Sequence, residues 1–353
     1  MEIKNLLEQL NKSEASDLLL AGKNYAYLRI NNSLVKIEDR MLSPEEVEAL
    51  IAPLVPKEKM EEFRHYKELD ASYEDEQSRY RLNLHYQLGS MGATIRRIPK
   101  EIPTLDDLKL PVKVREFAAL ERGLILVTGP TGCGKSTTQA AMINSINMTR
   151  ACHIVTIEDP IEFVHSPKQA MIEQREVGFD TNSFGEALKR VLRQMPDVVL
   201  VGEMRDLESI QMAITAAETG HLVISTLHTQ DAVQSIDRVI DVFPPYQQGQ
   251  VRTQLSLTLA GIVSQQLLPR TDGKGLVGSY EILVATPAVR NIIRKGSTQD
   301  VYSMIELGGP FQMVTMDMSL FGLYEKRLIS REQAMSYSVN HERMERLLSG
   351  KTT

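Results

Sequence analysis

Disulfide and zinc frameworks are the first features that the sequence lacks. Its 353 residues include only two cysteines, Cys133 and Cys152, too few for a disulfide framework or a four-cysteine zinc site. Reduced thiols indicate a cytoplasmic setting. No apolar run reaches the roughly 18 to 20 residues of a membrane span, and residues 1–10 lack the apolar core of a signal peptide. We therefore expect no transmembrane segment, so that any work at a membrane is done through partners.

A basic surplus is absent as well. The formal net charge is −6, and aromatic residues make up 5% of the chain. Proteins that bind nucleic acids usually carry excess positive charge, because neutralised phosphates supply most of their affinity. The composition therefore disfavours a nucleic-acid partner. Hydrophobic residues at 42% and charged residues at 24% are ordinary for a soluble globular protein, and a chain of this length is expected to form two domains.

Residues 1–98 predict a small α+β domain at the N-terminus. Ser43 is expected to cap a helix, with Pro44 in its first turn and Glu46 at the reciprocal capping position. Two pairs of strands are expected around it. They are residues 25–30 and 34–37 around a tight turn at Asn31 and Asn32, then residues 79–86 and 93–98.

Residues 99–111 contain Pro99, Pro103 and Pro111, and we interpret this stretch as a semi-rigid linker, since proline restricts the backbone conformation of its own residue and of the preceding one.

The pattern changes over residues 112–353, where short apolar runs alternate with helical stretches. This alternation predicts an α/β domain with a parallel sheet covered on both faces. After residue 251 the pattern predicts mainly helices. The expected strands are residues 124–128, 154–157, 198–201 and 222–225.

A glycine-rich segment follows the first of these strands and precedes a helical stretch. It reads Gly129, Pro130, Thr131, Gly132, Cys133, Gly134, Lys135 and Ser136, followed by Thr137. Glycines let backbone N–H groups turn toward phosphate oxygens, and the start of a helix adds its positive end. Lys135 is placed to reach the β- and γ-phosphates, and the Ser136 hydroxyl to bind Mg²⁺. The sequence therefore predicts a P-loop that binds ATP with Mg²⁺, in which Cys133 is a small filler rather than a nucleophile.

Two carboxylates end apolar strands of the predicted sheet. Glu158 follows the strand at residues 154–157, and Glu203 follows the strand at residues 198–201. ATP hydrolysis at a P-loop needs an acid near Mg²⁺ and a group that orients the attacking water. The carboxyl ends of parallel strands share one edge of the sheet. We interpret Glu203 as the general base and Glu158 as a ligand of Mg²⁺ or of water, and the pattern leaves an exchange of these roles open.

Two histidines flank the strand expected at residues 222–225. His228 follows its carboxyl end and is a candidate to sense the γ-phosphate by hydrogen bonding. His221 precedes the strand and is the second candidate catalytic histidine. For both residues a structural role is the alternative.

Four motifs occur in a fixed order along the chain, at residues 129–137, 156–160, 201–206 and 226–229. They resemble the Walker A, Asp box, Walker B and His box of the type II/type IV secretion ATPases. The resemblance extends over nearly the whole chain. It implies an α/β, RecA-like P-loop ATPase domain that follows an N-terminal PAS-like α+β domain, and a homohexameric ring that hydrolyses ATP.

The same resemblance implies that each ATP site lies at the cleft between the two domains and is completed by arginines of the N-terminal domain. Arg81 and Arg96 match the family's positions. Alternation along residues 79–86 supports part of this expectation, because it places Arg79 and Arg81 on one face of a strand. The alternative is a solvated basic strand face.

Within the family, the chain resembles the pilus-retraction branch. Residues 16–20 begin a short N-terminal domain almost at once, and the four-cysteine zinc motif common in the assembly and secretion branches is absent. Residues 288–294 resemble the C-terminal box of the retraction branch, but Lys295 reverses the charge of its last position. Gln194-Met195 also stand where Glu-Asp is usual. The resemblance implies a motor of pilus retraction and twitching motility at the inner face of the cytoplasmic membrane, with an inner-membrane pilus platform protein as partner.

Several alternatives stay open on the sequence. The superfamily also contains assembly or secretion motors and accessory retraction ATPases, and a nucleic-acid motor or a regulator that binds nucleotide without hydrolysis are more distant alternatives. The segment at residues 288–295 has two interpretations as well. It is either a packed amphipathic helix or a helix whose Arg290 and Arg294 couple the ring to its partner.

Overall fold

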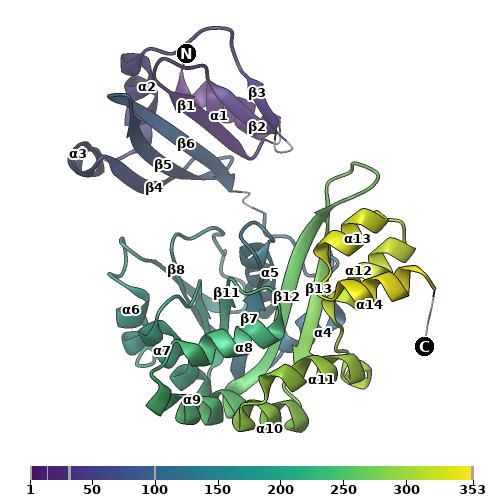
Figure 1. The fold of residues 1–353 in the computed structure, drawn as a ribbon. Helices are drawn as coiled ribbons and strands as arrows, with labels where there is room; N and C mark the ends of the chain where they lie inside the picture. Colours follow the sequence, from purple (N-terminus) through teal and green to yellow (C-terminus); the bar gives the residue numbers. More distant parts are fainter. Residues whose placement is uncertain (1, 14, 31–32, 99–100, 351–353) are drawn as a thin grey trace. The chain divides into compact units, whose positions relative to one another are not determined.

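The computed structural model describes residues 2–13, 15–30, 33–98 and 101–350. The chain folds into two compact units, Met1–Glu101 and Ile102–Thr353 (Figure 1). The tight turn expected at Asn31 and Asn32 lies outside the described residues. Among the helices of the described residues, none combines the length and apolar character that a bilayer crossing requires.

The first unit is built on a six-stranded antiparallel sheet with the strand order β3-β2-β1-β6-β5-β4. Leu18, Leu82 and Ile95 point from the strands into one core with the helices. Ser43 caps α2 as expected, because its hydroxyl accepts from the N–H of Glu46 and its own N–H donates to the Glu46 carboxylate. The elements are α1 (Ile3–Lys12), β1 (Asp17–Ala21), β2 (Tyr27–Ile30), β3 (Ser33–Lys36), α2 (Pro44–Ile51), α3 (Lys57–Tyr66), β4 (Glu68–Glu74), β5 (Arg79–Gln87) and β6 (Ser90–Ile98).

The second unit contains a seven-stranded sheet with the order β13-β12-β7-β11-β10-β8-β9. All neighbouring strands are parallel except β12 and β13. The strands are β7 (Gly123–Thr128), β8 (His153–Glu158), β9 (Met171–Glu176), β10 (Val198–Val201), β11 (Leu222–Leu227), β12 (Leu259–Pro269) and β13 (Leu276–Val284). The helices are α4 (Val112–Ala118), α5 (Lys135–Thr149), α6 (Phe184–Val191), α7 (Leu207–Glu218), α8 (Ala232–Asp241), α9 (Pro245–Thr258), α10 (Pro287–Lys295), α11 (Val301–Leu307), α12 (Met316–Glu325), α13 (Arg331–Tyr337) and α14 (His341–Leu348).

Helices cover both faces of this sheet, as the continuous apolar strands predict. One core holds residues of α4 and α5, and the other holds residues of α6 to α11. Leu105, with Leu108 and Leu110 beside it, joins the first of these cores, so part of the proline-containing stretch packs within the second unit. The interior strand β7 is buried along its whole length, and the loop that follows it is therefore held by a rigid support.

The expectation of mainly helical structure after residue 251 is wrong for residues 259–284. β12 and β13 form a long antiparallel hairpin there, and β12 also lies parallel to β7. Pairing of β12 with β7 ends at Ser264, so Gln265 to Pro269 pair with β13 alone. A strand buried on both faces lacks alternation of polar and apolar residues, which makes it hard to distinguish from a helix by pattern.

The three C-terminal helices α12, α13 and α14 form a separate small core around Leu268 near the end of β12. In Figure 1 they lie beside the β12–β13 hairpin. The hairpin therefore connects the central sheet to these helices.

Candidate functional site

The glycine-rich loop joins the carboxyl end of β7 to the start of α5 at Lys135. Gly132 has a φ of 81° and Gly134 a φ of 87°, conformations that L-residues with side chains rarely adopt. These glycines allow the tight turn by which a P-loop presents successive amides. The expected order of strand, loop and helix is thus present.

Lys135 crosses the loop from the first turn of α5. Its Nζ donates to the carbonyl of Gly129 at 2.8 Å and to that of Pro130 at 3.0 Å. Burial lowers the pKa of the lysine, an effect that the nearby charges of Glu203 and Glu162 partly offset. The ammonium group therefore sits within the loop, where a phosphate would meet it.

Glu158 ends β8 and lies among polar neighbours. The Thr156 hydroxyl donates to Glu158 Oε1 at 2.6 Å, and the Gln174 amide donates to the same oxygen at 3.2 Å. Burial raises the pKa of this carboxyl to about 7, and the charge of Glu162 contributes in the same direction. Both side-chain partners are neutral, so the carboxylate suits a cation that would keep it ionised.

Glu203 and His228 follow the adjacent parallel strands β10 and β11, which brings them together. His228 Nε2 lies 3.3 Å from Glu203 Oε2, and Arg205 Nη2 lies 2.6 Å from Glu203 Oε1. The Glu203 side chain is only 12% exposed. The carboxylate is therefore held in place from two sides at the edge of the sheet where the P-loop lies.

Three residues of this region were not among the expected site residues. Arg205 contacts Glu203 and Gln174 contacts Glu158, whereas Glu162 raises the pKa of Glu158 through its charge. Arg205 stands inside the motif at residues 201–206, and Glu162 follows the motif at residues 156–160 by two residues, so their positions close to the carboxylates are a usable signal. Gln174 comes from the neighbouring strand β9, and no local pattern indicates it.

His221 lies apart from Glu203 and His228 in the second unit, and a catalytic role for it stays a prediction. It precedes β11, and its carbonyl accepts from the N–H of Gly123 at the amino end of β7. Its ring Nδ1 lies 2.9 Å from the carbonyl of Ala216. The P-loop and His228 lie at the opposite, carboxyl ends of these strands, so the structural alternative fits His221.

Arg81 and Arg96 belong to the first unit, where they face each other across β5 and β6. Arg96 Nε donates to the Asp17 carboxylate at 2.8 Å, and Arg29 Nε lies 3.6 Å from the same group. Because they are directly opposite each other in the register, the two arginines share one face of the sheet. Their part in a nucleotide site stays a prediction.

Cys133 fills space beneath the P-loop. It is 3% exposed, and a Cβ added to Gly129 would come within 2.6 Å of its Sγ. Burial raises the pKa of the thiol. These features fit a small packed side chain, whereas a nucleophilic thiolate requires a lowered pKa.

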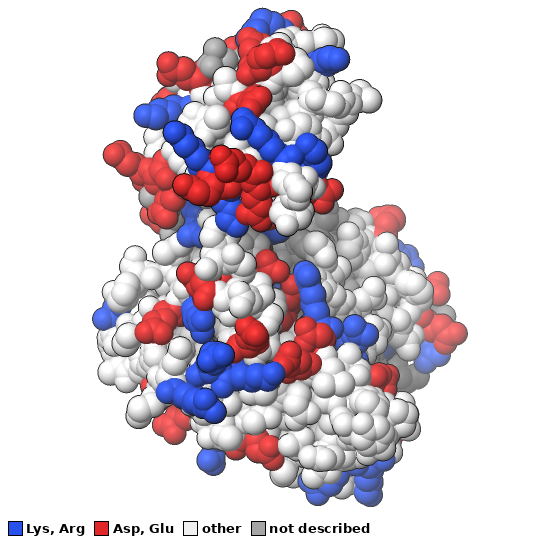
Figure 2. Space-filling view, turned by 90° about the vertical axis from the view of Figure 1, so that its left-hand side faces the viewer, with Lys and Arg blue, Asp and Glu red and all other residues white. Residues whose placement is uncertain are grey.

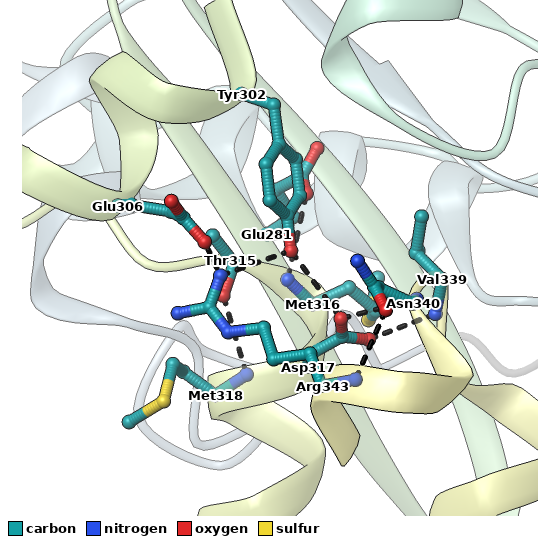
Figure 3. A network of polar contacts seen from close by, with 10 residues as sticks. All are labelled: Glu281, Tyr302, Glu306, Thr315, Met316, Asp317, Met318, Val339, Asn340 and Arg343. Atoms are coloured by element: carbon teal, nitrogen blue, oxygen red, sulfur yellow. Dashed lines mark hydrogen bonds and ion pairs between the residues drawn. The ribbon is translucent and has the colours of Figure 1, made fainter. Parts of the chain in front are cut away.

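A cavity of about 580 Å³ adjoins the P-loop within the second unit. Its walls are residues 130–133 of the loop, the start of α8 around Asp231, residues 266–267 of β12 and residues 336–339. Two buried carboxylates anchor these walls (Figure 3). The Asp317 carboxylate accepts from the N–H groups of Val339 and Asn340, and the Glu281 carboxylate accepts from that of Ala232.

A P-loop at the end of a buried central strand, with carboxylates at the ends of two further parallel strands, defines a RecA-like P-loop ATPase domain. Residues 93–275 match the family described as type II/IV secretion system protein. The chain belongs to this family.

Relatives match over nearly the full length. The chain is 45% identical over 335 residues to the type IV pilus retraction ATPase PilT of Pseudomonas aeruginosa, covering 95% of this chain and 97% of that protein. It is 38% identical over 339 residues to the type IV pilus ATPase PilU of that species, covering 96% and 89%. A crystal structure of the pilus retraction motor PilT with bound ADP matches with a TM-score of 0.91 at 43% identity, covering 98% of this chain and 99% of that one.

Proposed function

We propose that this chain is the ATP-hydrolysing motor of type IV pilus retraction and twitching motility, and that it works as a homohexameric ring. The observation that supports this most directly is the pairing of a complete P-loop with Glu203, held by Arg205 and His228. The near full-length similarity to PilT supports the pilus as the machine on which the motor acts.

In this proposal the P-loop amides and Lys135 bind the phosphates of ATP. Ser136 and Glu158 would hold Mg²⁺, since hydroxyl and carboxylate oxygens are the ligands this cation prefers. The Glu158 carboxyl is buried and has neutral hydrogen-bond partners, so a bound cation would balance its negative charge. When bound, Mg²⁺ would neutralise negative charge on the phosphates.

Glu203 would orient and deprotonate the attacking water, with Arg205 and His228 fixing the carboxylate. Arg81 and Arg96 of the PAS-like N-terminal domain would stabilise charge on the transferring phosphoryl group, as arginines do in other P-loop enzymes. Closure and reopening of the domains would then move a pilus platform protein at the inner face of the cytoplasmic membrane.

The first test is Glu203→Gln in the purified full chain. Since a positioned general base contributes roughly 10²- to 10⁴-fold to a rate, phosphate release should fall by about that factor while binding of ATP with Mg²⁺ persists. Glu208→Gln is the matched control, because Glu208 is exposed and pairs with Lys189 on the surface. Wild-type turnover in Glu203→Gln would remove this residue from the mechanism.

The nearest alternatives are an assembly motor and an accessory ATPase like PilU. Deletion of a retraction motor should abolish twitching and leave surface fibres in place. Loss of the fibres would indicate assembly instead, and twitching that persists at reduced force would indicate an accessory role.

The distribution of charged side chains on the surface gives little support to a nucleic-acid motor. On the face of the molecule drawn in Figure 2, basic and acidic side chains of the described residues are interspersed. This face thus offers no extended basic surface for a phosphate backbone. We therefore propose no nucleic-acid partner.

A further inference from the structure

Gln265 on β12 touches the P-loop at several points, although it lies 130 residues away in sequence from Lys135. It is 2% exposed. Its side-chain Nε2 donates to the carbonyl of Cys133 at 2.6 Å, and its Oε1 accepts from the hydroxyl of Thr138 at 2.9 Å. Its backbone carbonyl packs so closely on Gly129 that an added Cβ there would come within 2.3 Å of the oxygen.

The orientation of the Gln265 carboxamide is fixed by its partners. A backbone carbonyl only accepts hydrogen bonds, so the amide nitrogen must face Cys133 and the amide oxygen must face Thr138. The side chain therefore links the turn of the loop to the first turn of α5 with both of its polar atoms satisfied.

This contact also determines the direction of a loop amide. A trans peptide unit is planar, so the N–H of Gly134 points away from the carbonyl of Cys133. Gln265 holds that carbonyl toward β12, which directs the Gly134 N–H to the other side. Both Gly132 and Gly134 have positive φ, and glycine moves easily between positive and negative φ. The hydrogen bond from Gln265 therefore favours one orientation of this peptide.

We propose that Gln265 is a positioning residue of the nucleotide site, which holds the P-loop in the conformation that receives phosphates. The inference rests on the proposed function only in that the loop must bind a phosphate chain. Ser264 supports the same junction, because its hydroxyl accepts from that of Thr128 at 2.9 Å at the end of β7. β12 therefore acts on the loop through two consecutive residues.

The test is Gln265→Met, which keeps the volume and removes both polar contacts. Isothermal titration calorimetry on the full chain would measure binding of ADP and, separately, of inorganic tripolyphosphate. We expect both affinities to fall about tenfold and by the same factor, because the change lies at the phosphates. The KM for ATP should rise to a similar extent while kcat changes less than about threefold, the signature of lost uniform binding.

Gln248→Met is the matched control. The Gln248 amide also donates to a backbone carbonyl, that of Phe243, but near the start of α9. The affinities of Gln248→Met for ADP and tripolyphosphate should stay at the wild-type level. Circular dichroism at the titration temperature would establish that each variant is folded. If Gln265→Met does not fold, Gln265→Asn retains the carboxamide but is one methylene shorter, and the same loss of affinity is expected.

Three results would overturn the inference. They are wild-type affinity for tripolyphosphate in the folded Gln265 variant, a loss confined to ADP, and an equal loss in Gln248→Met. Failure of the proposed function is a distinct result, since it concerns phosphate release and pilus retraction by the wild-type chain. Binding of tripolyphosphate tests the loop alone.

Discussion

Glu281 allows a quantitative prediction about the pH dependence of stability. The residue lies on β13, is 1% exposed and accepts from the backbone N–H groups of Ala232 at 2.8 Å and Met316 at 3.4 Å. Burial raises the pKa of its carboxyl from 4.5 to about 7, with the charge of Asp231 contributing. The folded protein therefore retains a proton on this group that the unfolded chain releases near pH 4.5.

The sign follows from proton linkage. Between about pH 4.5 and 7 the folded state binds more protons than the unfolded state, so the free energy of unfolding falls as the pH rises. The stabilisation from this group is complete below the unfolded pKa and is lost as the pH rises through the folded pKa. Because each pKa unit is worth about 1.36 kcal/mol, the total loss by alkaline pH is about 3 kcal/mol.

Glu281→Gln should remove this pH dependence. The variant keeps one acceptor oxygen and loses the longer contact to Met316, at a cost of about 1 kcal/mol at pH 5. It should become about 2 kcal/mol more stable than the wild type at pH 9, since the wild type has by then lost about 3 kcal/mol. Glu158 remains in both proteins, so its own titration cancels in the difference.

Urea unfolding at several pH values between 5 and 9 would measure this difference. Far-ultraviolet circular dichroism is the suitable signal, because the chain contains no tryptophan. Glu342→Gln, at a carboxylate that is 89% exposed, should give a curve parallel to that of the wild type. Parallel curves for Glu281→Gln and the wild type would refute the reasoning.

Three further predictions concern the loop, the metal ligand and α10. Gly129→Ala should weaken ADP binding at least tenfold in calorimetry, because its Cβ would lie 2.3 Å from the Gln265 carbonyl at a φ of 144°; wild-type binding would contradict this. The Mg²⁺ concentration that gives half-maximal ATP turnover should rise as the pH falls below about 7, because protons then compete with the cation for the Glu158 carboxylate; a Mg²⁺ requirement that stays constant from pH 6 to 8 would argue against its role. Arg290→Gln should lower the free energy of unfolding by about 2 kcal/mol, since this guanidinium donates to the carbonyls of Ser256, Leu257 and Ala285. An unchanged urea midpoint with twitching lost would instead favour a role in partner coupling.

The central strands of the α/β sheet could be predicted from the sequence. β7, β8, β10 and β11 are short apolar runs between helices, and each matches its expected range to within two residues at either end. Their physical origin is local, because a strand buried on both faces must be apolar throughout. β9 was not expected, since it is a polar strand at the edge of the sheet.

The hairpin of β12 and β13 could not be predicted in this way. Its position depends on pairing between Leu259–Ser264 and β7, more than 130 residues earlier. For the α10 segment, by contrast, the local spacing of apolar residues was enough to indicate its structure. The buried side chains of Val289 and Ile293 and the contacts of Arg290 with backbone carbonyls fit the packed helix that helical spacing indicated.

The same distinction applies to the site. Glu158, Glu203 and His228 lie at one edge of the sheet because parallel strands end there, a rule that needs only the strand assignments. His221 differs, because proximity in sequence to a strand does not show at which end of the strand, and so at which edge of the sheet, the residue lies. Gln174, Gln265 and Glu281 depend on contacts between distant strands and helices, and no spacing in the sequence indicates them.

The second half of the β12–β13 hairpin extends beyond the rest of the sheet. From Gln265 to Pro269 it has a neighbour on one side only, and it extends about 16 Å at about 3.3 Å per residue. Two-stranded ribbons are more strongly twisted than wide sheets. One end of this ribbon therefore touches the phosphate loop through Gln265, and further along it Leu268 lies in the core of the C-terminal helices. A change in either place has only a few residues of one ribbon to cross before it reaches the other.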